Sequence, residues 1–302
     1  MKTIITIFIQ LIFIGGIMSQ SYTDKKGNEQ LWGSVNINQL LEGEYEEWYT
    51  KNLKDFETNL SGNDGALLKD VEVKIFIGTW CGDTKYLLPK FIKAWEEMGL
   101  ETSKLDLIAL HNFDELYKQG PANETKDQNI HRVPTFIFEK NGKEIGRIVE
   151  RTVFDLDTDI RTIAKGLPYE QRYKAVTMLD TLIQNLNPDS LDTYNSLKIC
   201  HNTVYREVST VSELNTYGYV LMAENKLDLA ELVLKVNRYL FPYHPNARDS
   251  YGEVLLKNGK LDKAKKEYLE AIRLRPDNDN VISQLAVINE KLKEQNSSEL
   301  IE

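Results

Sequence analysis

Two cysteines, Cys81 and Cys200, are the side chains of this sequence with the clearest capacity for chemistry. Cys81 lies in the segment W-C-G-D-T (residues 80–84), which follows an alternating and then apolar run over 71–78. Apolar residues at helical spacing follow over 87–95, so Cys81 is expected between a buried strand and a helix. A thiol that ionises there can carry out thiol–disulfide exchange. Cys200 occupies an expected helix face, where a buried and inert thiol is the usual outcome.

Composition excludes several classes of protein and site. Two cysteines are too few for a disulfide framework, and a structural zinc site would need the four histidines. Cys81 and His131 together would give a metal only two ligands, so no metal site and no cofactor are expected. The 37 basic and 46 acidic residues leave a charge of −9, which argues against a nucleic-acid partner. The length of 302 residues, 41% of them apolar, predicts about two folded domains.

Residues 1–19 have the pattern of a secretory signal peptide. Lys2 precedes a 15-residue apolar run, and the small Ser19 precedes Gln20 at a predicted cleavage site. An uncleaved membrane anchor is the alternative, but 15 residues are short for a span of about 20. No cysteine follows the run directly, so no lipid attachment is expected there. The prediction is a periplasmic or secreted protein that meets the membrane only during export, in a compartment where thiols and disulfides can function.

The elements expected to position Cys81 occupy residues 37–167. The polar stretch 20–36 is expected to be a loose lead-in, and Ser61 to Gly65 are expected to interrupt the chain. The predicted elements are a helix over 37–60, a strand over 71–78, a helix over 87–95, a strand over 105–110, a hairpin over 136–149 and a helix over 155–166.

This order, with W-C-x-x-T after the first strand and V-P-T before the hairpin, resembles the thioredoxin fold. The resemblance implies a thioredoxin-like α/β domain over 37–167 with Cys81 at a helix N-terminus. Free N–H groups and the helix dipole stabilise an anion there and favour the thiolate. The resemblance also places Val133 and Pro134, in the position of the family's cis proline, opposite the cysteine. Trp80, Val133 and Pro134 are then the expected contacts of a substrate strand.

The motif departs from the family at Thr84, where the dithiol cycle uses a second cysteine. A hydroxyl can donate a hydrogen bond to the Cys81 thiolate but cannot attack a sulfur atom. His131 and Arg132 precede the V-P-T segment, so both are expected near Cys81, where a cation would favour the thiolate. Asp83 would oppose it unless the carboxylate caps the helix or is solvated.

Three uses of Cys81 are compatible with this motif. Cys81 can form a mixed disulfide that an external thiol or redox partner resolves, it can pair with Cys200, or it can be idle in a redox-inactive scaffold. The first use is the main prediction and describes a monothiol oxidoreductase or isomerase. The scaffold, which would only bind proteins or peptides, is the alternative.

Beyond residue 167 only helical patterns occur. Residues 168–210 are expected to form a helical connector, followed by units at 211–244 and 245–278, a capping helix at 279–294 and a tail at 295–302. The period of 34 residues resembles the tetratricopeptide repeat, which implies an all-α domain. Identical residues recur at this offset: Tyr217, Gly218, Leu221, Leu227, Asp228, Ala230 and Pro242 match Tyr251, Gly252, Leu255, Leu261, Asp262, Ala264 and Pro276.

The same resemblance implies a concave surface on the repeats. Its predicted residues are Asn215, Tyr219, Met222, Asp249 and Glu253. This surface either binds a protein or peptide partner, or the repeats only pack against the first domain and stabilise it.

Overall fold

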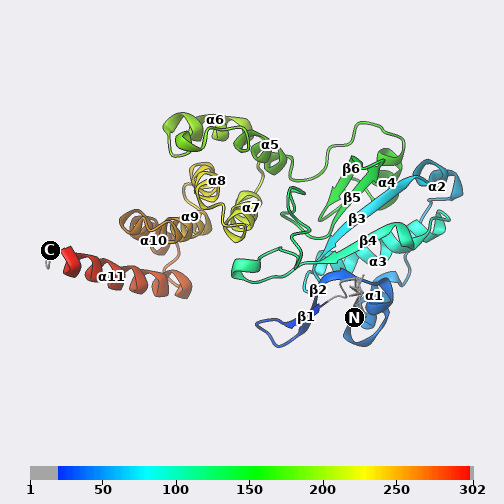
Figure 1. The fold of residues 1–302 in the computed structure, drawn as a ribbon, viewed down its shortest axis with the longest axis horizontal. Coiled ribbons are helices and arrows are strands. Elements are labelled where there is room, and N and C mark those ends of the chain that lie inside the picture. Colours follow the sequence, from blue (N-terminus) through cyan, green and yellow to red (C-terminus); the bar gives the residue numbers. More distant parts are fainter. Residues whose placement is uncertain (1–19, 300–302) are drawn as a thin grey trace, which may run out of the picture.

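The computed structural model describes residues 20–299, so the predicted signal peptide at 1–19 lies outside the described residues. An α/β part (residues 20–167) is followed by an all-helical part (residues 168–299), as Figure 1 shows. The predicted order, an α/β domain followed by an all-α domain, is therefore confirmed.

The α/β part is built on a six-stranded mixed sheet with the strand order β1-β2-β4-β3-β5-β6. Strands β3 and β4 are parallel, and each of the other neighbouring pairs is antiparallel. The predicted strands and hairpin thus appear in the structure, with β3 at the centre. The strands are β1 (Gln20–Thr23), β2 (Glu29–Val35), β3 (Val71–Ile77), β4 (Leu105–Ala109), β5 (Thr135–Lys140) and β6 (Lys143–Val149).

The two faces of the sheet are covered differently. Alternate residues of β3, from Val71 to Ile77, pack with the apolar sides of α3 (Gly82–Glu97) and α4 (Leu156–Ala164). Helix α1 (Gly43–Leu53) lies against α3. The opposite face carries a smaller apolar cluster that includes Phe76, and the β4–β5 loop (residues 110–134) contributes to it.

The lead-in predicted over 20–36 is wrong, because this segment forms the β1–β2 hairpin and the edge of the sheet. Its polar composition conceals an alternation in which Leu31 and Val35 are buried. At Gly33 φ is +94°, and an added Cβ would lie 3.0 Å from Pro121 of the β4–β5 loop, so glycine is required there.

The predicted interruption after residue 60 is a short helix, α2 (Gly62–Leu68). Ser61 and Asp64 form a capping box that satisfies its first backbone N–H groups. The helix predicted over 37–60 is shorter than expected, comprising a 3-10 turn (Ile37–Leu41) and α1.

The helical part consists of antiparallel helices around a second apolar core. Helices α7 and α9 begin 34 residues apart, at Val211 and Pro245, and α8 and α10 repeat the same offset from Leu227 to Leu261. Helix α11 continues to Glu299, beyond the predicted end of the capping helix. The helices are α5 (Lys174–Ile183), α6 (Tyr194–Val204), α7 (Val211–Ala223), α8 (Leu227–Leu240), α9 (Pro245–Lys257), α10 (Leu261–Leu274) and α11 (Asp279–Glu299).

The helices of the pairs α7/α8 and α9/α10 approach each other closely at a glycine. A Cβ added to Gly218 of α7 would lie 2.6 Å from Leu234 of α8, and one added to Gly252 of α9 would lie 3.1 Å from Tyr268 of α10. None of the helices within 20–299 combines the length and apolarity needed to cross a membrane.

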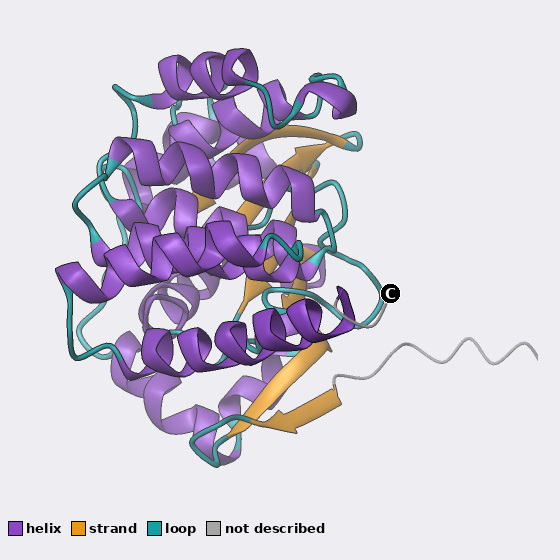
Figure 2. Ribbon diagram, turned by 90° about the vertical axis from the view of Figure 1, so that its left-hand side faces the viewer, coloured by secondary structure: helices purple, strands orange, loops and turns teal. Residues whose placement is uncertain are grey.

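The helical part lies against the α/β part, and the β4–β5 loop lies between them. Figure 2 shows the stacked helices in front of the strands, and Figure 1 shows the loop extending from the sheet toward α7. Its short 3-10 turn, Asp114–Leu116, contacts α7.

Candidate active site around Cys81

Cys81 is the N-cap residue of α3 and is partly exposed. Its backbone N–H donates to the Gly78 carbonyl at 2.8 Å, which closes the turn between β3 and α3. Its Sγ donates to the Val133 carbonyl at 3.2 Å, and the Val133–Pro134 peptide bond is cis. The structure therefore brings together the three predicted residues Cys81, Val133 and Pro134, with the thiol at the positive end of a helix dipole.

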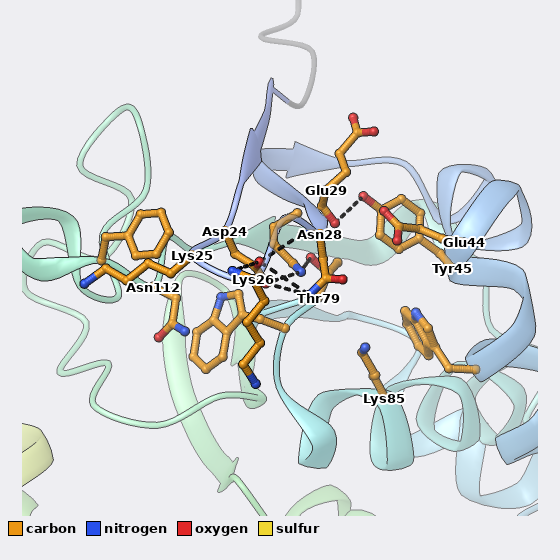
Figure 3. Close-up of a pocket in the computed structure, with 14 residues that line it drawn as sticks. Asp24, Lys25, Lys26, Asn28, Glu29, Glu44, Tyr45, Thr79, Lys85 and Asn112 are labelled. Carbon is orange, nitrogen blue, oxygen red and sulfur yellow. Dashed lines mark hydrogen bonds between the residues drawn. The ribbon is translucent and has the colours of Figure 1, made fainter.

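Trp80 forms one wall beside the thiol. Its indole Nε1 donates to the Leu110 carbonyl at 3.0 Å, and its ring packs on the cluster that contains Phe76. Trp80 also lines a cavity of about 490 Å³ between the β1–β2 hairpin, α1 and the start of α3. Figure 3 shows Lys85 and Tyr45 on opposite elements of this cavity, which opens beside the Cys81 turn.

The β1–β2 hairpin anchors that turn through Thr79, which lies two residues before Cys81. The Thr79 hydroxyl donates to Gln30 Oε1 at 2.7 Å and accepts from the Leu31 N–H at 3.1 Å. Both Thr79 and Gln30 are buried. Sequence reasoning missed this positioning role because it treated residues 20–36 as a loose segment.

Thr84 occupies the third helical position and is fully buried. Its Oγ1 accepts a hydrogen bond from the Gly78 N–H at 3.3 Å, so the side chain supports the turn. It provides no sulfur that could attack a disulfide formed at Cys81.

Cys200 does not pair with Cys81, since both thiols are free. Cys200 is fully buried in the core of the helical part. Burial raises the pKa of the Cys200 thiol to about 11, so this thiol is unreactive at neutral pH.

Asp83 forms an ion pair with Arg151, with 2.9 Å between Arg151 Nε and Asp83 Oδ1. Arg151 follows β6, so the pair joins the start of α3 to the end of the hairpin. The Asp83 charge is thus partly balanced by a residue that the sequence analysis did not single out.

His131 cannot supply the positive charge predicted for it. The side chain is buried, and burial together with the neighbouring Arg132 lowers the pKa of His131 to about 3. The imidazole is therefore neutral at neutral pH. Its ring lies edge-on to Tyr173 and Tyr217, with centroids 5.9 and 6.4 Å away, in the contact between the two parts of the chain.

Arg132 joins the α/β part to the helical part. Its Nη1 pairs with Glu150 at 3.0 Å, and its Nη2 donates to the Ser212 carbonyl of α7 at 2.9 Å. Its guanidinium lies 4.8 Å from the centre of the Tyr173 ring. Tyr173 also donates to Glu150 through its hydroxyl. Arg132, which was predicted to lie near Cys81, therefore fixes the docking of α7.

Lys118 of the β4–β5 loop lies against Trp80, the residue before Cys81, and Tyr117 lies against Lys118. Sequence reasoning missed both residues. Lys118 is only 4% exposed, and its Nζ lies 5.7 Å from the Trp80 ring centre and 3.9 Å from that of Tyr117. Burial lowers the pKa of Lys118 to about 7; Arg132 lowers it further, whereas a Cys81 thiolate acts in the opposite direction. A polar loop gave no sign that one of its lysines is buried.

The residues of the helical part that were predicted to form a concave surface separate into two groups. Tyr219, Met222 and Glu253 line a cavity of about 600 Å³, to which Tyr117 and Asn112 of the β4–β5 loop also contribute. The Tyr219 hydroxyl donates to Glu253 at 2.8 Å.

Asn215 instead links α7 to α8, and Asp249 links α9 to the turn before α11. Asn215 accepts from the Asn237 side chain at 2.7 Å, and Asp249 accepts from Asn278 at 3.2 Å. Burial raises the pKa of Asp249. Across the described range 20–299, no set of three or more histidine, cysteine or acidic side chains is arranged to hold a metal ion.

No model of a known protein family matches the chain. The chain is similar to thioredoxin H9 of Arabidopsis thaliana, with 30% identity over 119 residues. The similarity covers 39% of this chain and 75% of that protein. With its sheet, its flanking helices and the cysteine at the N-terminus of α3, the chain belongs to the thioredoxin family.

Proposed function

We propose that the protein carries out thiol–disulfide exchange through Cys81 as a single reactive thiol. The observation that carries this proposal is the position of its Sγ, at the N-cap of α3 and 3.2 Å from the Val133 carbonyl. The helix terminus favours the thiolate, and once the thiol has lost its proton the Val133 carbonyl is free to accept a hydrogen bond from an extended client segment.

The reaction has two displacement steps. The Cys81 thiolate attacks one sulfur of a client disulfide, forms a mixed disulfide and releases the other client sulfur as a thiolate. An external thiolate, such as that of a small thiol or a redox partner, then attacks the client sulfur of this mixed disulfide. Cys81 leaves as the thiolate, and the external thiol becomes bonded to the client. Thr84 cannot perform this second attack, so the mixed disulfide persists until the external thiol arrives.

We further propose that α7–α10 are two tetratricopeptide repeats capped by α11 and that their cavity binds a protein or peptide. The 34-residue offsets and the close approaches at Gly218 and Gly252 support the repeat assignment. The cavity lined by Tyr219, Met222 and Glu253 supports the binding role. Because Tyr117 lines this cavity and also lies beside Lys118, a client bound there would be close to the Cys81 turn.

Export to a periplasmic or extracellular compartment is part of the proposal, on the basis of the pattern in residues 1–19. Expression of the full chain in a bacterium, followed by fractionation and N-terminal sequencing, tests it. A mature N-terminus at Gln20 in the periplasm is expected. An unprocessed protein in the cytoplasm would contradict export without affecting the chemistry proposed for Cys81.

The exchange activity is tested with a glutathionylated peptide as client and glutathione as external thiol. Wild type and Cys200→Ser are expected to deglutathionylate the peptide at equal rates, whereas Cys81→Ser should be inactive. In the absence of glutathione, wild type should accumulate a mixed disulfide visible by mass spectrometry. Equal background rates for all three proteins would refute the proposal.

A redox-inactive scaffold is the second candidate, and the Thr84 side chain in place of a resolving thiol favours it. In that case, client proteins captured from the native host would bind Cys81→Ser as strongly as wild type. Their capture would instead depend on residues of the repeat cavity, such as Tyr219. Loss of binding in Cys81→Ser would exclude the scaffold.

A further inference from the structure

Lys118 is a buried amine whose position is fixed by the backbone. The Lys118 backbone N–H donates to the His111 carbonyl at 2.9 Å, and the His111 backbone N–H donates to the Gln119 carbonyl at 3.1 Å. The Gln119 carbonyl also accepts from the Trp32 indole at 2.9 Å, and the Tyr22 ring stacks on His111 with centroids 3.9 Å apart. The base of the β4–β5 loop is thus held by the β1–β2 hairpin, and Lys118 has little freedom to turn toward solvent.

No carboxylate among the described side chains is paired with the Lys118 ammonium. The charged side chains of Arg132 and Glu150 both act on the pKa of Lys118, and they pair with each other at 3.0 Å. Asp83, at the start of α3, is paired with Arg151. A buried cation is strongly disfavoured unless an anion is close by, and the carboxylates near Lys118 are already committed to arginines.

The remaining groups around the Lys118 amine are aromatic or neutral. Its Nζ donates to the Tyr117 hydroxyl and lies over the faces of Tyr117 and Trp80. His131 is neutral, as described above. Trp80, whose ring centre lies 5.7 Å from this amine, directly precedes Cys81. The Cys81 sulfur is therefore a group close to the Lys118 side chain that can become an anion and is not already paired with a cation.

We propose that Lys118 is a positioning residue for the Cys81 chemistry: its buried ammonium balances the Cys81 thiolate, and each charge favours the other. This inference rests on the proposed exchange function and deepens it. In the free enzyme the pair holds the thiolate ready, and when Cys81 enters a mixed disulfide Lys118 loses its anion. Departure of Cys81 as a thiolate in the second step restores the pair.

Helix α7 contributes to this arrangement through Tyr117. The Tyr117 ring lies 6.3 Å from that of Tyr219 of α7, centroid to centroid. Since Tyr117 accepts the hydrogen bond of Lys118, the docked helical part helps to hold the amine over the Trp80 ring.

The test is the pH profile of Cys81 alkylation by iodoacetamide, measured in the full chain with Cys200→Ser as background. Lys118→Met is expected to lower the alkylation rate at pH 6.5 about tenfold, since removal of a nearby opposite charge disfavours the thiolate. Lys118→Arg should restore most of the rate. Lys126→Met removes an exposed lysine of the same loop and should leave the profile unchanged. An unchanged profile in folded Lys118→Met would overturn the inference.

A reciprocal measurement does not depend on how Lys118→Met folds. In protein labelled with 13C at lysine Cε, the titration midpoint of Lys118 is expected to fall by about one pH unit in Cys81→Ser, because the two ionisations are coupled. An equal midpoint in both proteins would refute the pairing. If the parent protein exchanges disulfides but Lys118→Met behaves like the parent, only this inference fails. If the parent shows no exchange at all, the proposed function fails first.

Discussion

On the proposed function, the substitution Thr84→Cys should convert the single-thiol site at Cys81 into a dithiol site. Cys81 is at the N-cap and Thr84 at the third helical position, so their side chains leave the same end of α3. Residues three apart in a helix have Cα atoms about 5 Å apart, from the rise and radius of the helix. This separation lies within the range of about 4.4–6.8 Å that a disulfide spans.

The cost in stability should be small. Thr84 is fully buried, and a cysteine side chain would fill nearly the same space but would lack the threonine hydroxyl. The lost contact is the 3.3 Å hydrogen bond from the Gly78 N–H, which the new sulfur can accept only weakly. A buried donor with a weakened acceptor costs about 1 kcal/mol, the low end of the usual range because the bond is long. For the α/β part this corresponds to a fall in Tm of about 2–4 °C.

The assay is the reduction of insulin disulfides by dithiothreitol, followed by turbidity. Wild type should reduce insulin only as fast as dithiothreitol attacks each mixed disulfide, whereas Thr84→Cys resolves the mixed disulfide internally and should turn over faster. Oxidised Thr84→Cys should also contain one internal disulfide by mass spectrometry. Cys81→Ser combined with Thr84→Cys is the matched control. A folded Thr84→Cys that forms no internal disulfide would refute the geometry assigned to the start of α3.

Three further predictions concern stability and accessibility. At pH 8, iodoacetamide should alkylate Cys200 more than about a hundredfold more slowly in the folded protein than in protein unfolded by guanidinium, because burial raises the pKa of this thiol to about 11. Comparable rates would contradict the burial of Cys200. Asp64 pairs with Arg161, which holds the pKa of the Asp64 carboxyl below its usual range in the folded protein. The ion pair therefore stabilises the folded state above about pH 4, and this contribution is lost as the pH falls through the pKa that Asp64 has in the folded protein. Asp64→Asn should therefore cost about 1 kcal/mol at pH 7 and less at pH 3, measured by urea unfolding; an equal cost at both pH values would contradict the pairing. Gly218→Ala should destabilise the helical part by about 1–3 kcal/mol, although alanine has the better helix propensity, because the Leu234 side chain must move. A raised Tm would show that Leu234 moves freely.

The sequence predicted the architecture around Cys81 because its signals are local. The apolar run of β3, the helical spacing after W-C-G-D-T and the Asn141–Gly142 turn each specify one element. The motif around Pro134 then placed Val133 near Cys81 through the resemblance. The hairpin β1–β2 was missed because its strands are short and mostly polar, and its second strand is specified by pairing with β4, far along the chain.

The electrostatics of the site were less predictable, since they depend on burial and tertiary contacts. His131 was expected to be a cation, but packing against Tyr173 and Tyr217 removes it from water. Lys118 lies in a polar loop of the kind that is usually solvated, yet its side chain is buried against Tyr117 and Trp80. Neither the domain contact nor the resulting desolvation leaves a periodic pattern in the sequence.

The position of the β1–β2 hairpin has a consequence for biosynthesis. Ribosomes make β2 before β4, yet Val35 pairs with Leu107, so the first strands to be made must wait for a partner more than seventy residues away. An isolated two-stranded hairpin is marginally stable in water. The nascent chain therefore exposes an unpaired edge until β4 has emerged, and a chaperone that binds extended segments would find its target in the β1–β2 hairpin.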